Sequence, residues 1–240
     1  MAWFFTEPFE GQHHIITGEN AVHIEKSLRM KIGEALTLVD SEGMQYSCVI
    51  ENISGDGVEV KAEKKFRCEN EPDVYITLYQ ALPKGDKMDF IIQKAVELGV
   101  SSIVPFVSAR CISRPDKKSA AKKVQRWNKI ALQAAQQSRR GIIPKVMPVT
   151  TFSEAAASLN ENDCNIIFYE CGGERAGNII NRHFDRINIF IGSEGGFEKS
   201  ETDKIISKGG TAATLGKRVL RAETAPLAAL AIIMYITGNA

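Results

Sequence analysis

The spacing of apolar and polar residues changes near residue 72, and this change predicts two domains. Before it lie three runs in which apolar and polar residues alternate, at 35–40, 44–53 and 58–64. Alternation of this kind between short glycine-bearing turns is typical of antiparallel hairpins. A short helix is predicted at 18–28, where Ile24 and Leu28 share one side. We therefore expect a small β-barrel domain over residues 1–71.

After residue 74 the pattern alternates between short apolar runs and helical spacing. Strands are predicted at 74–82, 103–107, 165–170, 187–191 and 211–215, and helices at 88–98, 117–138, 198–208 and 223–236. Strands that alternate with helices form a parallel sheet with helices on its faces. The predicted fold class is therefore α/β over residues 72–240. The polar segment 67–73, which contains a proline, is predicted to be the linker.

Glycine-bearing loops follow three of these strands. The carboxyl ends of parallel strands meet at one edge of the sheet, where ligands bind, and the glycines at 192, 195 and 196 allow a backbone to approach a ligand closely. The loops do not match the phosphate-binding pattern, because Glu198 stands where that pattern requires glycine. Glu194 instead favours a neutral or cationic ligand. The sulfonium S-adenosylmethionine fits that description.

Charge is distributed unevenly along the chain of 240 residues. The formal net charge is only +1, yet residues 110–145 hold eleven Lys or Arg and one acid, Asp116. The helix predicted at 117–138 carries lysines over much of its circumference. A merely solvated helix usually intersperses acids among its lysines, so this segment favours contact with the phosphates of a polyanion.

Several classes of protein are disfavoured by composition. The longest apolar run, 226–236, is shorter than the roughly 20 residues that span a bilayer. The start of the chain lacks the pattern of a signal peptide. Five cysteines are scattered without C-x-x-C spacing or clustered histidines, which favours reduced thiols, a cytoplasmic location and no metal site.

Several motifs resemble one known family. They are GSEGGF at 192–197, LGKRVLRAETA at 215–225, QALPK at 80–84, IQKAVELGV at 92–100 and AQQSRR at 135–140. Together they resemble the knotted SPOUT-class RNA methyltransferases. Within that class they resemble the ribosomal RNA small subunit methyltransferase E family, which methylates N3 of a uridine in 16S ribosomal RNA. The resemblance runs from about residue 23 to residue 225.

The resemblance implies an architecture, a cofactor and partners. It implies a PUA-like β-barrel that binds RNA over residues 1–71, and an α/β methyltransferase domain over 72–240 whose C-terminal segment threads a trefoil knot. It implies S-adenosylmethionine as the cofactor, no metal, and the small ribosomal subunit as the substrate. Enzymes of this class are typically dimers, so we expect a homodimer in which the basic patch of one protomer serves the pocket of the other.

Candidate site residues follow from the motifs and their chemistry. Backbone groups and apolar walls for the cofactor are expected from Glu170, Ile191, Gly192, Gly195, Gly196, Leu215, Gly216, Val219 and Leu220. RNA contacts are expected from His23, Arg29, Lys84, Arg110, Arg114 and Arg140. The alternative for these cations is that they only decorate a solvated surface.

The expected chemistry centres on Arg221. Uracil N3 is a poor nucleophile until it loses its proton, and a planar guanidinium near O2 or O4 would stabilise the resulting anion. Glu223 could accept the proton or orient Arg221, and Glu194 is the rival acceptor. A structural ion pair between Arg221 and Glu223 at a helix N-terminus is the alternative interpretation.

Three residues depart from the family pattern. Ser193 stands where proline is usual, Gln136 replaces a glutamate, and Arg139 replaces a glycine. They affect the expected local geometry and RNA affinity more than the type of reaction. Two other functions stay open: a related enzyme that methylates another rRNA or tRNA nucleotide, and a non-catalytic RNA-binding protein of ribosome assembly.

Overall fold

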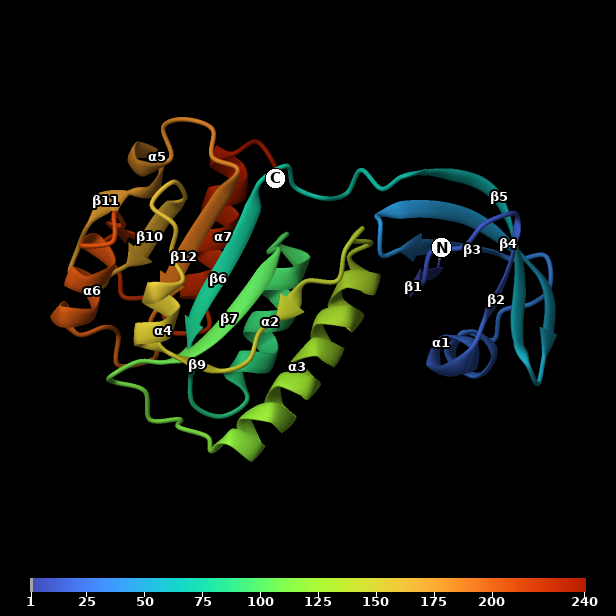
Figure 1. Ribbon diagram of the computed structural model, residues 1–240, viewed down its shortest axis with the longest axis horizontal. Helices are drawn as coiled ribbons and strands as arrows, with labels where there is room; N and C mark the ends of the chain where they lie inside the picture. Colours follow the sequence, from blue (N-terminus) through green and yellow to red (C-terminus); the bar gives the residue numbers. More distant parts are fainter. Residues whose placement is uncertain (1) are drawn as a thin grey trace. The chain divides into compact units, whose positions relative to one another are not determined.

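The chain forms two compact units in the computed structural model, which describes residues 2–240 (Figure 1). Unit 1 comprises the residues up to Glu71 together with Ala135–Ile142. Unit 2 comprises Pro72–Ala134 and Ile143–Ala240. A short segment from the second half of the chain therefore belongs to the first unit.

Unit 1 contains a five-stranded sheet in the order β1-β3-β4-β5-β2. Its strands are β1 (Ala2–Thr6), β2 (His13–Ile16), β3 (Ala35–Asp40), β4 (Met44–Ser54) and β5 (Gly57–Arg67). The three predicted runs form β3, β4 and β5, which pair antiparallel, so the predicted hairpins are confirmed. Strands β1 and β2 have no counterpart in the sequence pattern, because both are too short to show a clear alternation.

The helix predicted at 18–28 exists but changes type midway. The α-helix α1 (Gly18–Val22) continues into a π-helix, η1 (His23–Ser27). In η1 the N–H of Leu28 donates to the carbonyl of His23 at 2.9 Å, five residues back. This wider turn rotates the next residues relative to an α-helix. Ile24 is fully buried whereas Leu28 is 44% exposed, so the expectation that they share one side was wrong.

Unit 2 is built on an eight-stranded sheet whose main path is β11-β13-β10-β12-β6-β7-β8, with β9 also paired to β7. The strands are β6 (Tyr75–Ala81), β7 (Ser102–Val107), β8 (Lys145–Val146), β9 (Thr150–Thr151), β10 (Cys164–Phe168), β11 (Glu174–Arg175), β12 (Arg186–Ile191) and β13 (Thr211–Thr214). Every recorded pairing is parallel, which confirms the predicted α/β sheet. The loops after these strands consequently lie at one edge.

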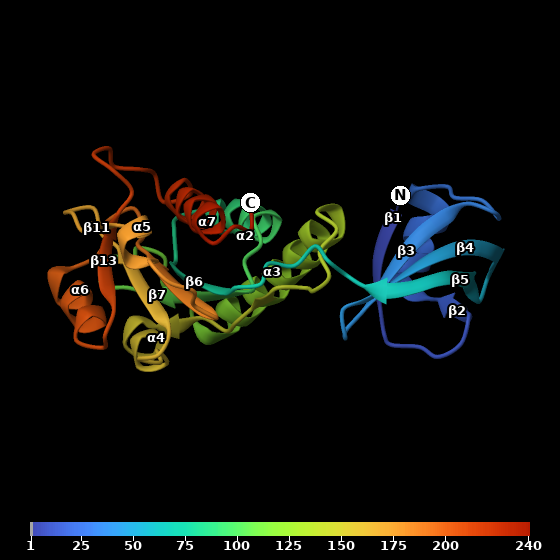
Figure 2. The ribbon, with the colours of Figure 1, turned by 90° about the horizontal axis from the view of Figure 1, so that it is seen from above.

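Helices cover both faces of this sheet (Figure 2). One face carries α2 (Lys87–Glu97), α5 (Ala176–Ile179) and α7 (Ala225–Ile236), and the other carries α4 (Phe152–Ala157) and α6 (Lys199–Ile206). The basic helix α3 (Lys117–Gln137) is anchored beside β8, because Asn128 bonds to both backbone groups of Val146. It also contacts α2, where the Trp127 indole donates to Asp89.

A buried aromatic cluster connects the sheet to the loops beyond it. Phe106, Phe190 and Phe197 are each at most 1% exposed, and the rings of the last two lie 5.9 and 6.3 Å from that of Phe106. Burying side chains of this size stabilises the fold by about 2–3 kcal/mol each. Since Phe197 follows the glycine turn after β12, this packing fixes the position of that turn.

Within residues 2–240, no helix is both long and apolar enough to cross a membrane. The same part of the chain contains no group of three or more His, Cys, Asp and Glu arranged to hold a metal ion.

Candidate active site

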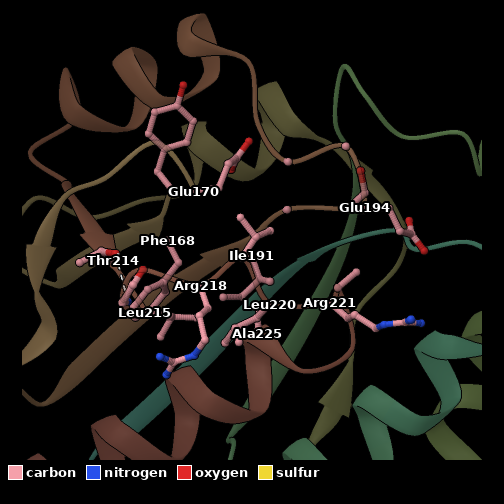
Figure 3. Close-up of a pocket in the computed structure, with 18 of the residues that line it drawn as sticks. Phe168, Glu170, Ile191, Glu194, Thr214, Leu215, Arg218, Leu220, Arg221 and Ala225 are labelled. Atoms are coloured by element: carbon pink, nitrogen blue, oxygen red, sulfur yellow. Dashed lines mark hydrogen bonds between the residues drawn. The ribbon is translucent and has the colours of Figure 1, made fainter.

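A cavity of about 430 Å³ lies at the carboxyl ends of β10, β12 and β13 (Figure 3). That volume is within the usual range for small-molecule sites. Its walls come from three loops that are far apart in the sequence, together with the start of α7. The nine residues expected to bind a cofactor all line it: Glu170, Ile191, Gly192, Gly195, Gly196, Leu215, Gly216, Val219 and Leu220.

The turn after β12 forms one side of the cavity. The N–H of Gly196 donates to the carbonyl of Ser193 at 2.9 Å, and Gly196 has a φ of +66°. A Cβ at Gly196 would lie 1.9 Å from Oε1 of Glu170. Only glycine lets the Glu170 carboxylate rest on this turn, so the two loops meet here without a side chain between them.

An unused hydrogen-bonding group faces the same region. Ser193 lines the cavity, and its Oγ is buried without a hydrogen-bond partner among the described residues. A buried hydroxyl without a partner costs free energy, so such a group points to a missing ligand or water. The residue that departs from the family pattern therefore contributes a polar atom that proline would lack.

A lysine that the sequence analysis did not single out joins the two candidate proton acceptors. Lys87 Nζ lies 2.9 Å from Oε1 of Glu194 and 3.1 Å from Oε2 of Glu223. Glu194 also accepts from the backbone N–H of Lys84 at 3.1 Å. The only sequence signal was a lysine at the start of a predicted helix, and that position is usually solvated.

The electrostatics of this cluster favour its charged forms. The contacts with Glu194 and Glu223 raise the pKa of Lys87. Burial opposes the charge on Glu194, but hydrogen bonds from Lys87 and from the backbone outweigh it and lower the pKa of this carboxyl. The pKa of Glu223 is lowered by its own backbone N–H, then by Lys87 and by the nearby charge of Arg221. All three groups are therefore ionised at neutral pH.

Arg221 lines the cavity and is exposed. Figure 3 shows Arg221 and Glu194 at one end of the cavity and Thr214 at the other. Among the described residues the Glu223 carboxylate forms its ion pair with Lys87 and none with Arg221. The alternative of a structural Arg221–Glu223 ion pair is therefore not what the fold contains, and the guanidinium stays available to a ligand.

Of the expected RNA-binding residues in unit 2, two lie close to the cavity loops. The Arg110 guanidinium donates to the carbonyl of Gly195 at 3.0 Å and lies 4.0 Å from Glu170. Lys84 is exposed beside Glu194. Arg114 instead donates to carbonyls of its own loop, at distances of 2.8 to 3.2 Å, and so fixes the loop after β7.

The remaining three lie in unit 1 and differ in exposure. His23 and Arg29 are exposed, and Arg29 adopts a φ of 52°, which is unusual for a residue with a side chain. Arg140 is only 3% exposed, and its guanidinium donates to both oxygens of Glu71. Arg140, which was expected to contact RNA, is therefore buried beside Glu71 and its guanidinium is not exposed to a ligand.

Glu71, in the predicted linker, is held by hydrogen bonds within unit 1. It lies in the polar segment 67–73, yet its carboxylate accepts from Arg140 and from the N–H of Gly141 at 2.7 Å. Trp3 of β1 donates from its indole to the carbonyl of Arg140 at 3.1 Å. These bonds explain why Ala135–Ile142 belongs to unit 1.

Two family models match the chain. One describes an RNA methyltransferase domain and matches residues 70–234, and the other describes an RNA methyltransferase PUA domain and matches residues 16–63.

Individual relatives agree with these matches. Ribosomal RNA small subunit methyltransferase E of Bacillus subtilis (strain 168) is 34% identical over 229 residues, which cover 92% of this chain and 90% of that protein. The crystal structure of a ribosomal RNA small subunit methyltransferase E from Neisseria gonorrhoeae bound to S-adenosyl methionine has a TM-score of 0.89 and 33% identity, over 98% of each chain. A methyltransferase structure from Legionella pneumophila in complex with the cofactor SAM has a TM-score of 0.87 and 29% identity, over 98% of this chain and 96% of that one.

Proposed function

Since this chain belongs to the ribosomal RNA small subunit methyltransferase E family, we propose that it methylates N3 of a uridine in 16S ribosomal RNA with S-adenosylmethionine. One observation carries the proposal. The GSEGGF turn, the LGKRVLRA segment and the loop at Glu170 are far apart in the sequence, yet they enclose a single cavity.

The residues of the cavity fit S-adenosylmethionine. When bound, this cofactor supplies a methyl group on a sulfonium, which is already a good electrophile. Leu215 and Leu220 offer apolar walls for an adenine, and the Ser193 hydroxyl offers a hydrogen bond that the protein leaves unused. The lining carries both signs of charge: the carboxylates of Glu170 and Glu194, which suit the sulfonium, and the cations Lys87, Lys217, Arg218 and Arg221, which suit the carboxylate of the cofactor.

The chemistry requires removal of a proton and stabilisation of an anion. We assign to Arg221 the stabilisation of negative charge on the uracil oxygens, because this residue is exposed, lines the cavity and has no ion pair with Glu223 among the described residues. We assign to Glu223 the role of accepting the proton that leaves N3 of uracil. Its Oε2 is buried 3.1 Å from Lys87 Nζ, and no hydrogen bond of standard geometry satisfies it among the described residues. Glu223 follows Ala222, which lines the cavity, but is not itself a lining residue. Glu194 uses its oxygens on Lys84 and Lys87.

RNA binding is proposed for both units. His23 and Arg29 would contact RNA in a PUA-like domain over residues 1–71, and Lys84 and Arg110 would contact it beside the cavity of a methyltransferase domain over 72–240. On α3 the side chains of Lys118, Lys122 and Lys129 are exposed, and no described carboxylate pairs with them. Cations of this kind supply phosphate contacts.

Further features of the family are proposed for this chain. The Thr6 hydroxyl and His14 bond at 2.9 Å between the two edge strands of unit 1, which supports a closed barrel. Strand β13 lies between β10 and β11 although β12 precedes it in sequence, which is consistent with a trefoil knot. The knot itself is inferred from the family.

A homodimer that acts on the small subunit in the cytoplasm completes the proposal. The apolar helix α7 exposes Tyr235 by 80% and Ile232 by 39%, and a second protomer would cover them. Sedimentation of the active protein as a dimer is the expected result, and a monomeric active species would contradict this part.

The reaction is tested directly on ribosomal subunits. The protein is incubated with labelled S-adenosylmethionine and small subunits that lack the modification, and the digested RNA is analysed by mass spectrometry. N3-methyluridine is the expected product, and Arg221→Ala should lower kcat by about 10²–10³-fold while cofactor affinity stays unchanged. Another methylated nucleoside would transfer the assignment to a related enzyme. No product together with no cofactor binding in calorimetry would leave a non-catalytic RNA-binding protein.

A further inference from the structure

We propose that Lys87 is a positioning residue that holds Glu194 and Glu223 together beside the cavity and keeps the proton acceptor in its basic form. This inference rests on the proposed methyl transfer, in which the acceptor must be ionised before the uridine arrives. Lys87 belongs to none of the motifs on which the family resemblance rests.

The ammonium of Lys87 connects three segments of the chain. Lys87 is the first residue of α2, Glu194 lies in the turn after β12, and Glu223 lies just before α7. The nitrogen is within 3.1 Å of both carboxylates. The side chains of the three residues are 22 to 32% exposed, so this contact is screened less than a contact on the open surface. Lys87 therefore ties the two loops to the start of one helix.

The charges around Lys87 are few. From its own segment, the N–H of Lys84 faces Glu194. From the other segments, Glu194 and Glu223 face it, and the charge of Arg221 acts on Glu223. Asp89, two residues further along α2, is engaged with Arg126 and Trp127 of α3. The ammonium is therefore the group that separates two carboxylates which would otherwise repel each other.

Removing the ammonium would change the protonation of the acceptor. Two carboxylates that share a small site cannot both ionise easily, and the pKa of one rises. A larger fraction of the acceptor would then hold a proton near neutral pH, and that fraction could not take another. In the proposed step the N3–H bond breaks, its proton moves to Glu223 and its electron pair forms the N3–CH₃ bond. The electrons of the broken S–CH₃ bond stay on sulfur, and Lys87 neither gains nor loses a proton.

A second lysine of the same helix shows what a purely structural pair looks like. Lys94 Nζ lies 2.8 Å from Glu97, three residues away, and the two side chains are 35% and 26% exposed. The pair has nearly the same length and exposure as the Lys87 contacts, but it lies within one helix and does not line the cavity. Such pairs contribute little to stability. Lys94 is therefore a matched control for Lys87.

The test compares Lys87→Met, Lys87→Arg and Lys94→Met, with kcat and KM measured from pH 5 to pH 9. In Lys87→Met we expect kcat at pH 7 to fall at least about tenfold, and the acidic limb of the kcat profile to move to higher pH, because a raised pKa must be exceeded before the acceptor is basic. Lys87→Arg keeps a cation at this position, so its kcat at pH 7 and the position of its acidic limb should both lie close to those of the wild type. Lys94→Met should match the wild type. An acidic limb in Lys87→Met that coincides with that of Lys94→Met would overturn the proposal.

A double variant and an activity-independent measurement complete the test. Lys87→Met with Glu194→Gln removes the repulsion, so its acidic limb should return toward that of the wild type; a limb that stays high would contradict the argument. Carbon-13 NMR titration of glutamate-labelled protein follows the carboxyls of Glu194 and Glu223 without any reaction. An upward shift of one pKa in Lys87→Met is expected, and no shift would overturn the inference. If the wild type makes no product, the titration still decides the role of Lys87 while the proposed function fails separately.

Discussion

Each unit contains a charge cluster that connects distant parts of the chain, and the two clusters are built differently. In unit 1, the Arg140 side chain is 3% exposed and that of Glu71 is 22% exposed, and both oxygens of Glu71 accept from Arg140. In unit 2, Lys87 lies between Glu194 and Glu223, and all three side chains are 22 to 32% exposed.

The difference lies in whether any hydrogen-bonding capacity is left over. Glu71 is saturated, because it also accepts from the N–H of Gly141. Oε2 of Glu223 has no hydrogen bond among the described residues, although an ammonium is near. A saturated pair with a buried guanidinium fixes one arrangement of the chain, whereas a cluster with an unsatisfied acceptor beside a cavity can take part in chemistry. The first cluster should therefore affect stability and the second should affect rate.

The largest effect is expected from breaking the buried pair. Arg140→Met leaves Glu71 without its partner and should lower the free energy of unfolding of unit 1 by about 3 kcal/mol. Trp3 reports on unit 1 and Trp127 on unit 2, so urea unfolding is followed by fluorescence in a Trp127→Phe background. Glu51→Gln, which breaks the exposed contact with His13 within unit 1, is the control and should cost less than about 1 kcal/mol. Equal losses in the two variants would remove the distinction between buried and exposed pairs.

A somewhat smaller effect is expected from cations that have no carboxylate partner among the described residues. Changing Lys118, Lys122 and Lys129 of α3 to glutamine should weaken binding to a small-subunit RNA fragment about a hundredfold at low salt, and flatten the slope of log K against log salt by about 2. Filter binding at several salt concentrations measures both. The same change at three exposed lysines of the α6 region, Lys199, Lys204 and Lys208, is the control. If both triple variants flatten the slope of log K against log salt equally, α3 has no special role in RNA binding.

A third prediction concerns the close approach of two cavity loops. Gly196→Ala introduces a Cβ that would lie 1.9 Å from Oε1 of Glu170, so the carboxylate must move and cofactor affinity should fall about tenfold. Gly209 has a φ of +80°, and a Cβ added there would meet no atom within 4 Å, so Gly209→Ala carries similar backbone strain without the clash. Calorimetry with S-adenosylmethionine distinguishes the variants. The prediction fails if both bind alike.

The smallest effect is expected in unit 1, on the free energy of unfolding. Arg139 replaces the glycine of the family pattern and has a φ of 58°, a conformation that costs a residue with a side chain about 1–2 kcal/mol. Arg139→Gly should therefore raise the free energy of unfolding by about 0.5–1 kcal/mol, after the entropy that glycine adds to the unfolded chain is subtracted. Arg29 has a φ of 52°, so Arg29→Gly should give a similar gain but weaken RNA binding as well. Urea unfolding measures the stability of the two variants, and filter binding measures their affinity for RNA. A lower free energy of unfolding in Arg139→Gly would contradict this prediction.

Much of unit 2 was accessible from local patterns. The largely apolar strands β10 (CNIIF) and β12 (RINIFI), each with one asparagine, are buried on both faces apart from Arg186 at the start of β12, as is typical of parallel strands between helix layers. Once the strands are parallel, the loops after them must share an edge, so the cavity could be located from the glycines at 192 and 196. The sequence pattern did not predict the strands β8, β9 and β11, because each has only two residues.

The sequence by itself determined the α/β sheet, the antiparallel hairpins of unit 1, the edge at which a ligand binds and the motifs of the family. Those features follow from periodicity and from turn residues, which act over a few positions. Tertiary structure alone decided that Lys87 meets Glu194 across 107 residues, and that Arg140 meets Glu71 instead of facing solvent. Periodicity tells which side of an element is buried, whereas the partner of a charged side chain depends on which distant elements pack beside it.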